Sequence, residues 1–103
     1  MRGDVYELRS PRGARGHEQT GGRYAVVVQS DSLPLSTWLV APTSTSVRPA
    51  SFRPEIVVNG ATSHVLVEQT AAVDPTRLGE HAGHLSFDEH RKVDAALRVA
   101  LEL

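Results

Sequence analysis

Three groups of polar side chains in this sequence have the residue types that chemistry on a phosphate group requires. The first group lies in the glycine-spaced segment GHEQTGGR, which contains His17 and Arg23 and is followed, after Tyr24, by the apolar stretch AVVV. Histidine transfers protons near neutral pH, and the planar fork of arginine donors matches a phosphate. Two shorter groups stand further along the chain: Thr43 with Ser44, and Glu68 with Gln69.

Each group is expected where a strand meets a loop. Period-two alternation and runs of β-branched residues predict strands at 4–8, 24–29, 36–41, 55–58 and 64–68. Pro42 is expected to end the third of these, so Thr43 and Ser44 follow it directly, and Glu68 ends the fifth. Three polar junctions of this kind are what a cleft on a small barrel requires, although independent surface loops would give the same pattern.

The remaining segments favour one mainly-β domain over residues 1–103. Residues 10–22 and 43–53 read as polar loops, Asn59-Gly60 as a hairpin turn, and Asp74 as the cap of one helical turn. Ser86 and Glu89 form a capping box that starts a C-terminal helix. Its predicted apolar stripe consists of Phe87, Val93, Leu97, Ala100 and Leu101. This order predicts a small antiparallel barrel with an amphipathic C-terminal helix over one end of the sheet.

Composition excludes several classes of protein. The chain has 103 residues and no cysteine, so disulfide frameworks, thiol catalysis and cysteine zinc sites are excluded. Its apolar runs are too short to span a membrane, and the N-terminus lacks a secretory signal, which predicts a cytoplasmic protein.

The net charge of the chain is −1. It divides into +3 over residues 1–53 and −4 over residues 54–103, and a modest positive field over one half could attract a polyanion.

The histidines near the C-terminus do not predict a metal site. His81, His84 and His90 have a spacing that matches no common metal centre, so we expect solvated side chains and no bound metal. Trp38 stands on a predicted strand, where a core or subunit-interface position is more typical than a base-stacking one.

Several segments together resemble the MazF/PemK/Kid family of toxin endoribonucleases. In chain order they are RGDVY, GHEQTGGRYAVVVQSD, VAPTS, SHVLVEQTAAVDPTRLGEHAGHLS and the terminal ALRVALEL, and they cover nearly the whole chain. The resemblance implies an SH3-like, partly open barrel that acts as a homodimer. It also implies a ribonuclease that needs no metal or other cofactor and cuts single-stranded RNA at short sequences. The implied partner is an antitoxin whose acidic, disordered tail fills the RNA groove.

The family's site residues transfer onto matching positions of this sequence. Its loop arginine falls on Arg23 and its strand-end threonine on Thr43, the two positions that we expect to carry catalysis. His17 matches a histidine of some members, and Glu68 and Gln69 match an acidic residue followed by glutamine.

Two positions depart from the family pattern. Tyr24 replaces the proline that usually follows the loop arginine. Leu66 stands where some members have an arginine, so a mechanism with that arginine as general acid is not available to this chain.

RNA supplies its own nucleophile, the 2′-hydroxyl, so the protein needs only a base, an acid and donors to the phosphate. We therefore expect Arg23 and Thr43 to bind the phosphate, with Arg23 also a candidate proton donor. Glu68 is the candidate base, and His17 either the acid or a second phosphate donor. Three further residues are candidates for RNA contacts. Their alternative roles are fixation of the loop for Gln19, closure of a turn for Ser44 and bracing of the cleft for Gln69.

Two other functions are compatible with such a barrel. One is a gyrase poison of the CcdB type. A resemblance to that type implies the same fold and a function without enzymatic activity. The chain ends in ALRVALEL without a polar or aromatic tip, and it carries Arg23 and Thr43, which favours the ribonuclease. The other is an inactive barrel that only binds RNA or an antitoxin. The RNA recognition sequence would lie in the loops at 10–22 and 47–54 and cannot be read from them.

Overall fold

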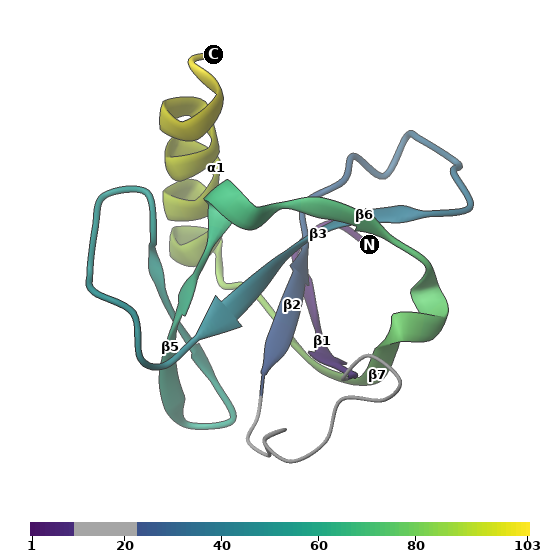
Figure 1. The fold of residues 1–103 in the computed structure, drawn as a ribbon, viewed down its shortest axis with the longest axis horizontal. Helices are drawn as coiled ribbons and strands as arrows, with labels where there is room; N and C mark the ends of the chain where they lie inside the picture. The colour runs from purple at the N-terminus through teal and green to yellow at the C-terminus, as the bar shows by residue number, and fades with distance from the viewer. Residues whose placement is uncertain (10–22) are drawn as a thin grey trace.

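The computed structural model describes residues 1–9 and 23–103, and Figure 1 shows them as a curled sheet with one helix against it. The spatial order of strands is β4-β5-β3-β2-β1-β7, β6 also pairs with β3, and these neighbouring strands pair antiparallel. The prediction of a mainly-β, partly open barrel with a C-terminal helix is confirmed. The strands are β1 (Asp4–Leu8), β2 (Tyr24–Val27), β3 (Trp38–Ser44), β4 (Glu55–Val58), β5 (Ala61–Val65), β6 (Ala71–Val73) and β7 (Leu78–His84). The helical elements are the 3₁₀ turns η1 (Val67–Gln69) and η2 (Pro75–Arg77) and the helix α1 (Phe87–Leu101).

Strand β3 joins the two halves of the barrel. One of its edges pairs with β2, from Val27 opposite Val40 to Ala25 opposite Pro42. Its other edge pairs with β6 as far as Val40 and then with β5 from Thr43 onward. Because two strands share this edge, the sheet divides at the middle of β3 and curls into the partly open barrel.

The prediction that Pro42 ends the third strand is wrong, because β3 continues through Thr43 to Ser44. Proline has no backbone N–H and is tolerated only where the ladder needs no donor. Pro42 lies where β3 has left β6 and has not yet begun to pair with β5. Its carbonyl still accepts a hydrogen bond from the amide of Leu66 at 2.8 Å. Thr43 and Ser44 are therefore strand residues and not the start of the loop.

Other strand boundaries also differ from the prediction. β2 ends at Val27, two residues early. Beyond it, the side chain of Gln29 donates to the Leu33 carbonyl of the following loop and accepts from the Leu39 amide of β3. The fifth strand ends at Val65, so Glu68 lies in η1 and not at a strand end. β6 and β7 were not predicted; β7 reads LGEHAGH, with two glycines and no β-branched residue.

Both predicted turns are confirmed. Asn59 and Gly60 have φ angles of 51° and 80°, the left-handed pair that a tight two-residue hairpin requires. The carboxylate of Asp74 accepts a hydrogen bond from the Thr76 amide at 2.9 Å, which caps η2 with Pro75 at its first position.

The core has two parts, on the two faces of the sheet. Alternate residues of β2 divide between them, since successive side chains of a strand point to opposite faces. Val26 packs with the residues under α1, whereas Ala25 and Val27 pack with Leu78 on the other face. Trp38 is half-buried against this second part, with its ring 5.9 Å from that of Tyr6, so its core position is confirmed.

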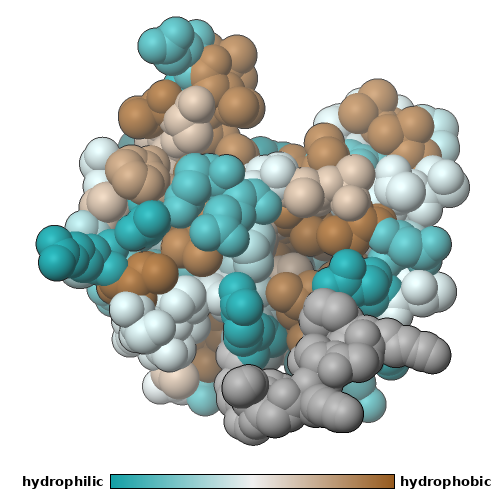
Figure 2. Space-filling model, in the orientation of Figure 1, coloured by the Kyte–Doolittle hydropathy of each residue, from teal (hydrophilic) through white to brown (hydrophobic). Residues whose placement is uncertain are grey.

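Helix α1 begins as predicted and buries part of the predicted stripe. The Ser86 hydroxyl accepts from the Glu89 amide, and the Glu89 carboxylate accepts from the Ser86 amide, as a capping box requires. Val93 is buried and Leu97 packs against the core. Phe87, at the start of α1, is exposed. Ala100 and Leu101 are exposed because the C-terminal end of the helix projects beyond the sheet, as Figures 1 and 2 show. Neither α1 nor the two 3₁₀ turns is long and apolar enough to cross a membrane.

Candidate active site

Arg23 and Thr43 are in direct contact, as the strand pairing predicts. Arg23 is exposed and immediately precedes β2, and its Nε donates a hydrogen bond to the Thr43 carbonyl at 3.3 Å. The amide of the next residue, Tyr24, donates to the Thr43 hydroxyl at 3.1 Å. Thr43 therefore holds the start of β2 through its backbone and its side chain together.

Thr43 is fully buried, which changes how it can act. Its side chain has no exposed surface, and its hydroxyl oxygen already accepts from the Tyr24 amide. A hydroxyl that accepts one hydrogen bond keeps its own proton to donate. The contact thus leaves Thr43 one donor and fixes the backbone that carries the Arg23 guanidinium.

Glu68 reaches the same end of β3 by another path. Val65 of β5 is opposite Thr43, and the next residue, Leu66, donates its amide to the Pro42 carbonyl at 2.8 Å. The chain then turns through η1, which carries Glu68. Pairing of β3 with β5 thus brings the second and third polar groups of the sequence to one region of the barrel.

The carboxylate of Glu68 is bound to Arg53, a residue that the sequence analysis did not select. Nε and Nη2 of Arg53 both donate to Oε2 of Glu68, at 3.1 and 3.0 Å. Arg53 stands in the loop before β4, and nothing in its spacing relates it to Glu68. The pairing arises only because η1 turns the acidic residue back toward that loop, so no sequence signal could have found it.

Ser44 closes a turn, and Gln69 exposes its side chain. The Ser44 hydroxyl accepts from the Ser46 amide at 3.1 Å and shares a second hydrogen bond with the Ser46 hydroxyl, which closes the turn after β3. The amide of Gln69 donates to the Leu66 carbonyl at 2.9 Å within η1, and its side chain is exposed. The predicted site residues His17 and Gln19 lie outside the described residues.

His64 is a second residue beside this region that the sequence analysis did not select. It lies opposite Ser44 on β3 and opposite Glu55 on β4, so the three side chains are cross-strand neighbours. Its Nδ1 is buried and has no hydrogen-bond partner among the described residues. A strand position without a motif gives no sequence signal for this placement.

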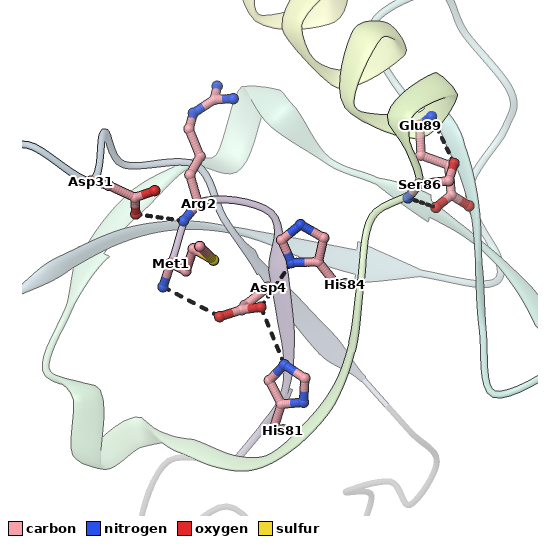
Figure 3. Close-up of polar contacts among 8 residues, drawn as sticks. All are labelled: Met1, Arg2, Asp4, Asp31, His81, His84, Ser86 and Glu89. Carbon is pink, nitrogen blue, oxygen red and sulfur yellow. Dashed lines mark hydrogen bonds and ion pairs between the residues drawn. The ribbon is translucent and has the colours of Figure 1, made fainter.

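Two of the C-terminal histidines bond one carboxylate (Figure 3). His81 and His84 both bond Oδ1 of Asp4, at 3.2 and 2.8 Å, and the N-terminal amine of Met1 lies 3.3 Å from Oδ2. Partial burial would raise the pKa of Asp4, but the bonds from His84, His81 and the N-terminus outweigh it and lower that pKa to about 2. Within residues 1–9 and 23–103, no group of three or more histidine, cysteine or acidic side chains could hold a metal ion.

The curled barrel with its terminal helix is the fold of solved MazF toxins. The family described as "PemK-like, MazF-like toxin of type II toxin-antitoxin system" matches residues 1–101. The chain belongs to this family.

Individual proteins resemble this chain over most of its length. It is 42% identical over 98 residues to the Mycobacterium tuberculosis toxin candidate Rv3098A, a match that covers 94% of this chain and 92% of that protein. A mycobacterial endoribonuclease, solved in complex with its cognate antitoxin, superposes with a TM-score of 0.81 at 18% identity, over 100% of this chain and 95% of that one. The Mycobacterium tuberculosis toxin MazF-mt6 has a TM-score of 0.77 at 17% identity over 97% of each chain. At these identities the two solved structures show the shared fold alone.

Proposed function

We propose that this protein is the toxin of a type II toxin–antitoxin pair and acts as a metal-independent endoribonuclease that cuts single-stranded RNA at specific sequences. The observation that carries the proposal is the contact between the Arg23 guanidinium and Thr43. This contact holds the exposed Arg23 guanidinium, the proposed phosphate-binding group, against the rigid sheet. A group that stabilises a transition state must be held in position in this way. Family membership and the endoribonuclease of the same fold support it.

The proposed reaction requires a base, an acid and cationic donors to the phosphate. The RNA 2′-oxygen attacks the adjacent phosphorus, a base takes the 2′-hydroxyl proton, and the bond from phosphorus to the 5′-oxygen breaks. An acid protonates that leaving oxygen, so the products are a 2′,3′-cyclic phosphate and a 5′-hydroxyl. Cationic donors stabilise the charge that develops on the phosphorane.

Contacts among the described residues support part of the assignment of roles. Arg23 binds the phosphate, and the buried Thr43 acts by fixing the start of β2 and the Arg23 side chain. Glu68 is the candidate base, since its bond to Arg53 occupies Oε2 and leaves Oε1 to accept a proton. His17 is the acid or a second phosphate donor. The further proposed RNA contacts are Gln19, Ser44 and Gln69.

The proposal includes a partner, an assembly and a location. An antitoxin with an acidic, disordered tail would compete with RNA for the same cations, and the net charge of +3 over residues 1–53 supports this. Apolar side chains that lie exposed on the surface, including Leu101 and Leu103 at the end of α1, support a homodimer. We place the protein in the cytoplasm, where its RNA substrate is.

One incubation tests the proposal against its rivals. The purified protein is mixed with a long single-stranded RNA with and without EDTA, and separately with gyrase and DNA. Cleavage that persists in EDTA and leaves 5′-hydroxyl ends supports the ribonuclease. Intact RNA together with gyrase-dependent DNA breaks would identify a gyrase poison, and RNA binding without cleavage would identify an inactive barrel; either result overturns the proposal.

A further inference from the structure

The ion pair between Arg53 and Glu68 leaves most of the arginine free to bind something else. Arginine carries five N–H donors, and here two of them, on Nε and Nη2, meet the single oxygen Oε2. Among residues 1–9 and 23–103, no hydrogen bond occupies Nη1 of Arg53. The side chain of Arg53 is 26% exposed and that of Glu68 is 30% exposed, so both are open to a ligand from solvent.

The pair lies beside the Arg23–Thr43 contact and not on a remote surface. The residue after Arg53, Pro54, accepts a hydrogen bond at its carbonyl from the Val65 amide at 2.9 Å, and Val65 is opposite Thr43. Neighbouring strands are about 4.8 Å apart, so Thr43 and Pro54 are separated by roughly 10 Å across β5. Arg23 and Arg53 therefore flank one end of β3 from its two sides.

The side chain of Arg53 is held in place more firmly than an isolated surface arginine. Its guanidinium carbon lies 5.1 Å from the centre of the Phe52 ring, and Glu68 bonds it from η1. η1 is itself tied to β3 through the bond from Leu66 to Pro42. A guanidinium that is fixed before the ligand arrives loses less conformational entropy on binding than a free one.

We propose that Arg53 is a further phosphate-binding residue of the RNA site and that Glu68 is the positioning residue that holds it. This inference rests on the proposed function, because it assigns to Arg53 a phosphate next to the one that Arg23 binds. Surface ion pairs contribute little to stability, so a loss of RNA affinity on removal of Arg53 would not follow from a loss of fold.

The test measures binding of a 2′-O-methyl RNA oligonucleotide, which cannot be cleaved, over a range of salt concentrations. Variants are Arg53→Ala, Arg53→Lys and Glu68→Ala, and Arg91→Ala on the exposed surface of α1 is the matched control for loss of one positive charge. We expect Arg53→Ala to weaken binding about tenfold and to reduce the slope of log affinity against log salt by about 0.7. Arg53→Lys should retain the salt slope but lose part of the affinity, because lysine keeps the charge without the fork.

The double variant Arg53→Ala with Glu68→Ala tests the positioning role. If Glu68 acts on binding through Arg53, the double variant binds as weakly as Arg53→Ala and no more weakly. Tighter binding by Glu68→Ala than by the unmodified protein would overturn that role, because the carboxylate would then only repel RNA.

The failures of the two proposals are distinguishable. Equal affinities and salt slopes for Arg53→Ala and Arg91→Ala, in a protein that still cleaves RNA, would overturn this inference and leave the proposed function intact. An unmodified protein that neither binds nor cleaves RNA would overturn both. Thermal unfolding of each variant verifies that the affinities compare folded proteins, and Arg53→Lys keeps the test decisive if Arg53→Ala is poorly folded.

Discussion

The amide of Tyr24 donates a hydrogen bond to the buried hydroxyl of Thr43 at 3.1 Å, at the point where β2 begins. A side chain thus takes the place of a backbone acceptor in the ladder between β2 and β3. Because Arg23 precedes Tyr24 directly, this bond fixes the backbone that carries the exposed Arg23 side chain.

The bond predicts that two substitutions of Thr43 differ in their effect on stability and on RNA cleavage. Thr43→Val keeps the shape but leaves the Tyr24 amide without its acceptor, so we expect a loss of about 1–3 kcal/mol in the free energy of unfolding. We also expect RNA cleavage to slow at least about tenfold, because Arg23 is no longer fixed. Thr43→Ser retains the hydroxyl and should retain most of both properties. Urea unfolding and cleavage rates measure the two effects, and equal stability of the Val and Ser variants would contradict the structure.

A second prediction concerns Glu89, which joins α1 to the edge of the sheet. Its Oε1 accepts from the Ser86 amide, and its Oε2 accepts from the amide of Val57 on β4 at 2.9 Å. We expect Glu89→Ala to lower the free energy of unfolding by about 1–2 kcal/mol, since two backbone donors lose their acceptor. Asp88→Asn, one position earlier and exposed, removes a first-turn charge without a backbone bond and should cost less. A urea titration in which the two variants lose equal stability would refute this account of α1.

A third prediction concerns acid stability. The pKa of Asp4 is about 2 in the folded protein, against 3.8 for an unperturbed carboxyl. Because the folded value is the lower one, the charged carboxylate stabilises the fold above about pH 4, and this contribution disappears as the pH falls toward 2.

The comparison with Asp4→Asn isolates that contribution. We expect the unmodified protein to lose about 1–2 kcal/mol more of its unfolding free energy than the variant between pH 5 and pH 2, after allowance for solvent screening. Urea titrations at several pH values measure this difference. Curves that run parallel over the whole range would show that the histidine and N-terminal contacts of Asp4 do not persist in solution.

The sequence predicted the parts of the fold that local patterns determine. β-branched runs located β2 and β4, a two-residue turn located the hairpin between β4 and β5, and a capping box located the start of α1. β7 escaped prediction because its glycines and polar residues pack through backbone pairing with β1, which local propensity does not encode. The prediction that Pro42 ends the third strand was wrong for a related reason. Whether a proline is tolerated within β3 depends on which strand lies beside it.

The candidate site divides in the same way. The family resemblance pointed to Arg23 and Thr43, and the pairing of β2 with β3 brings these two residues into contact. The partnership of Arg53 with Glu68 could not be predicted from the sequence, because it depends on a 3₁₀ turn where a strand was expected. Residues that meet through a turn of irregular geometry are brought together only by the tertiary fold.

The most direct test of the central claim is the rate at which an Arg23→Ala variant cleaves single-stranded RNA in the presence of EDTA, with Arg91→Ala as the charge-matched control. Removal of one preorganised donor to a developing oxyanion typically slows a reaction about 10²–10³-fold. We predict a loss of that size for Arg23→Ala, with cleavage by Arg91→Ala close to that of the unmodified protein. Cleavage by Arg23→Ala at the unmodified rate would contradict the assignment of Arg23 to the RNA phosphate and the proposed site with it.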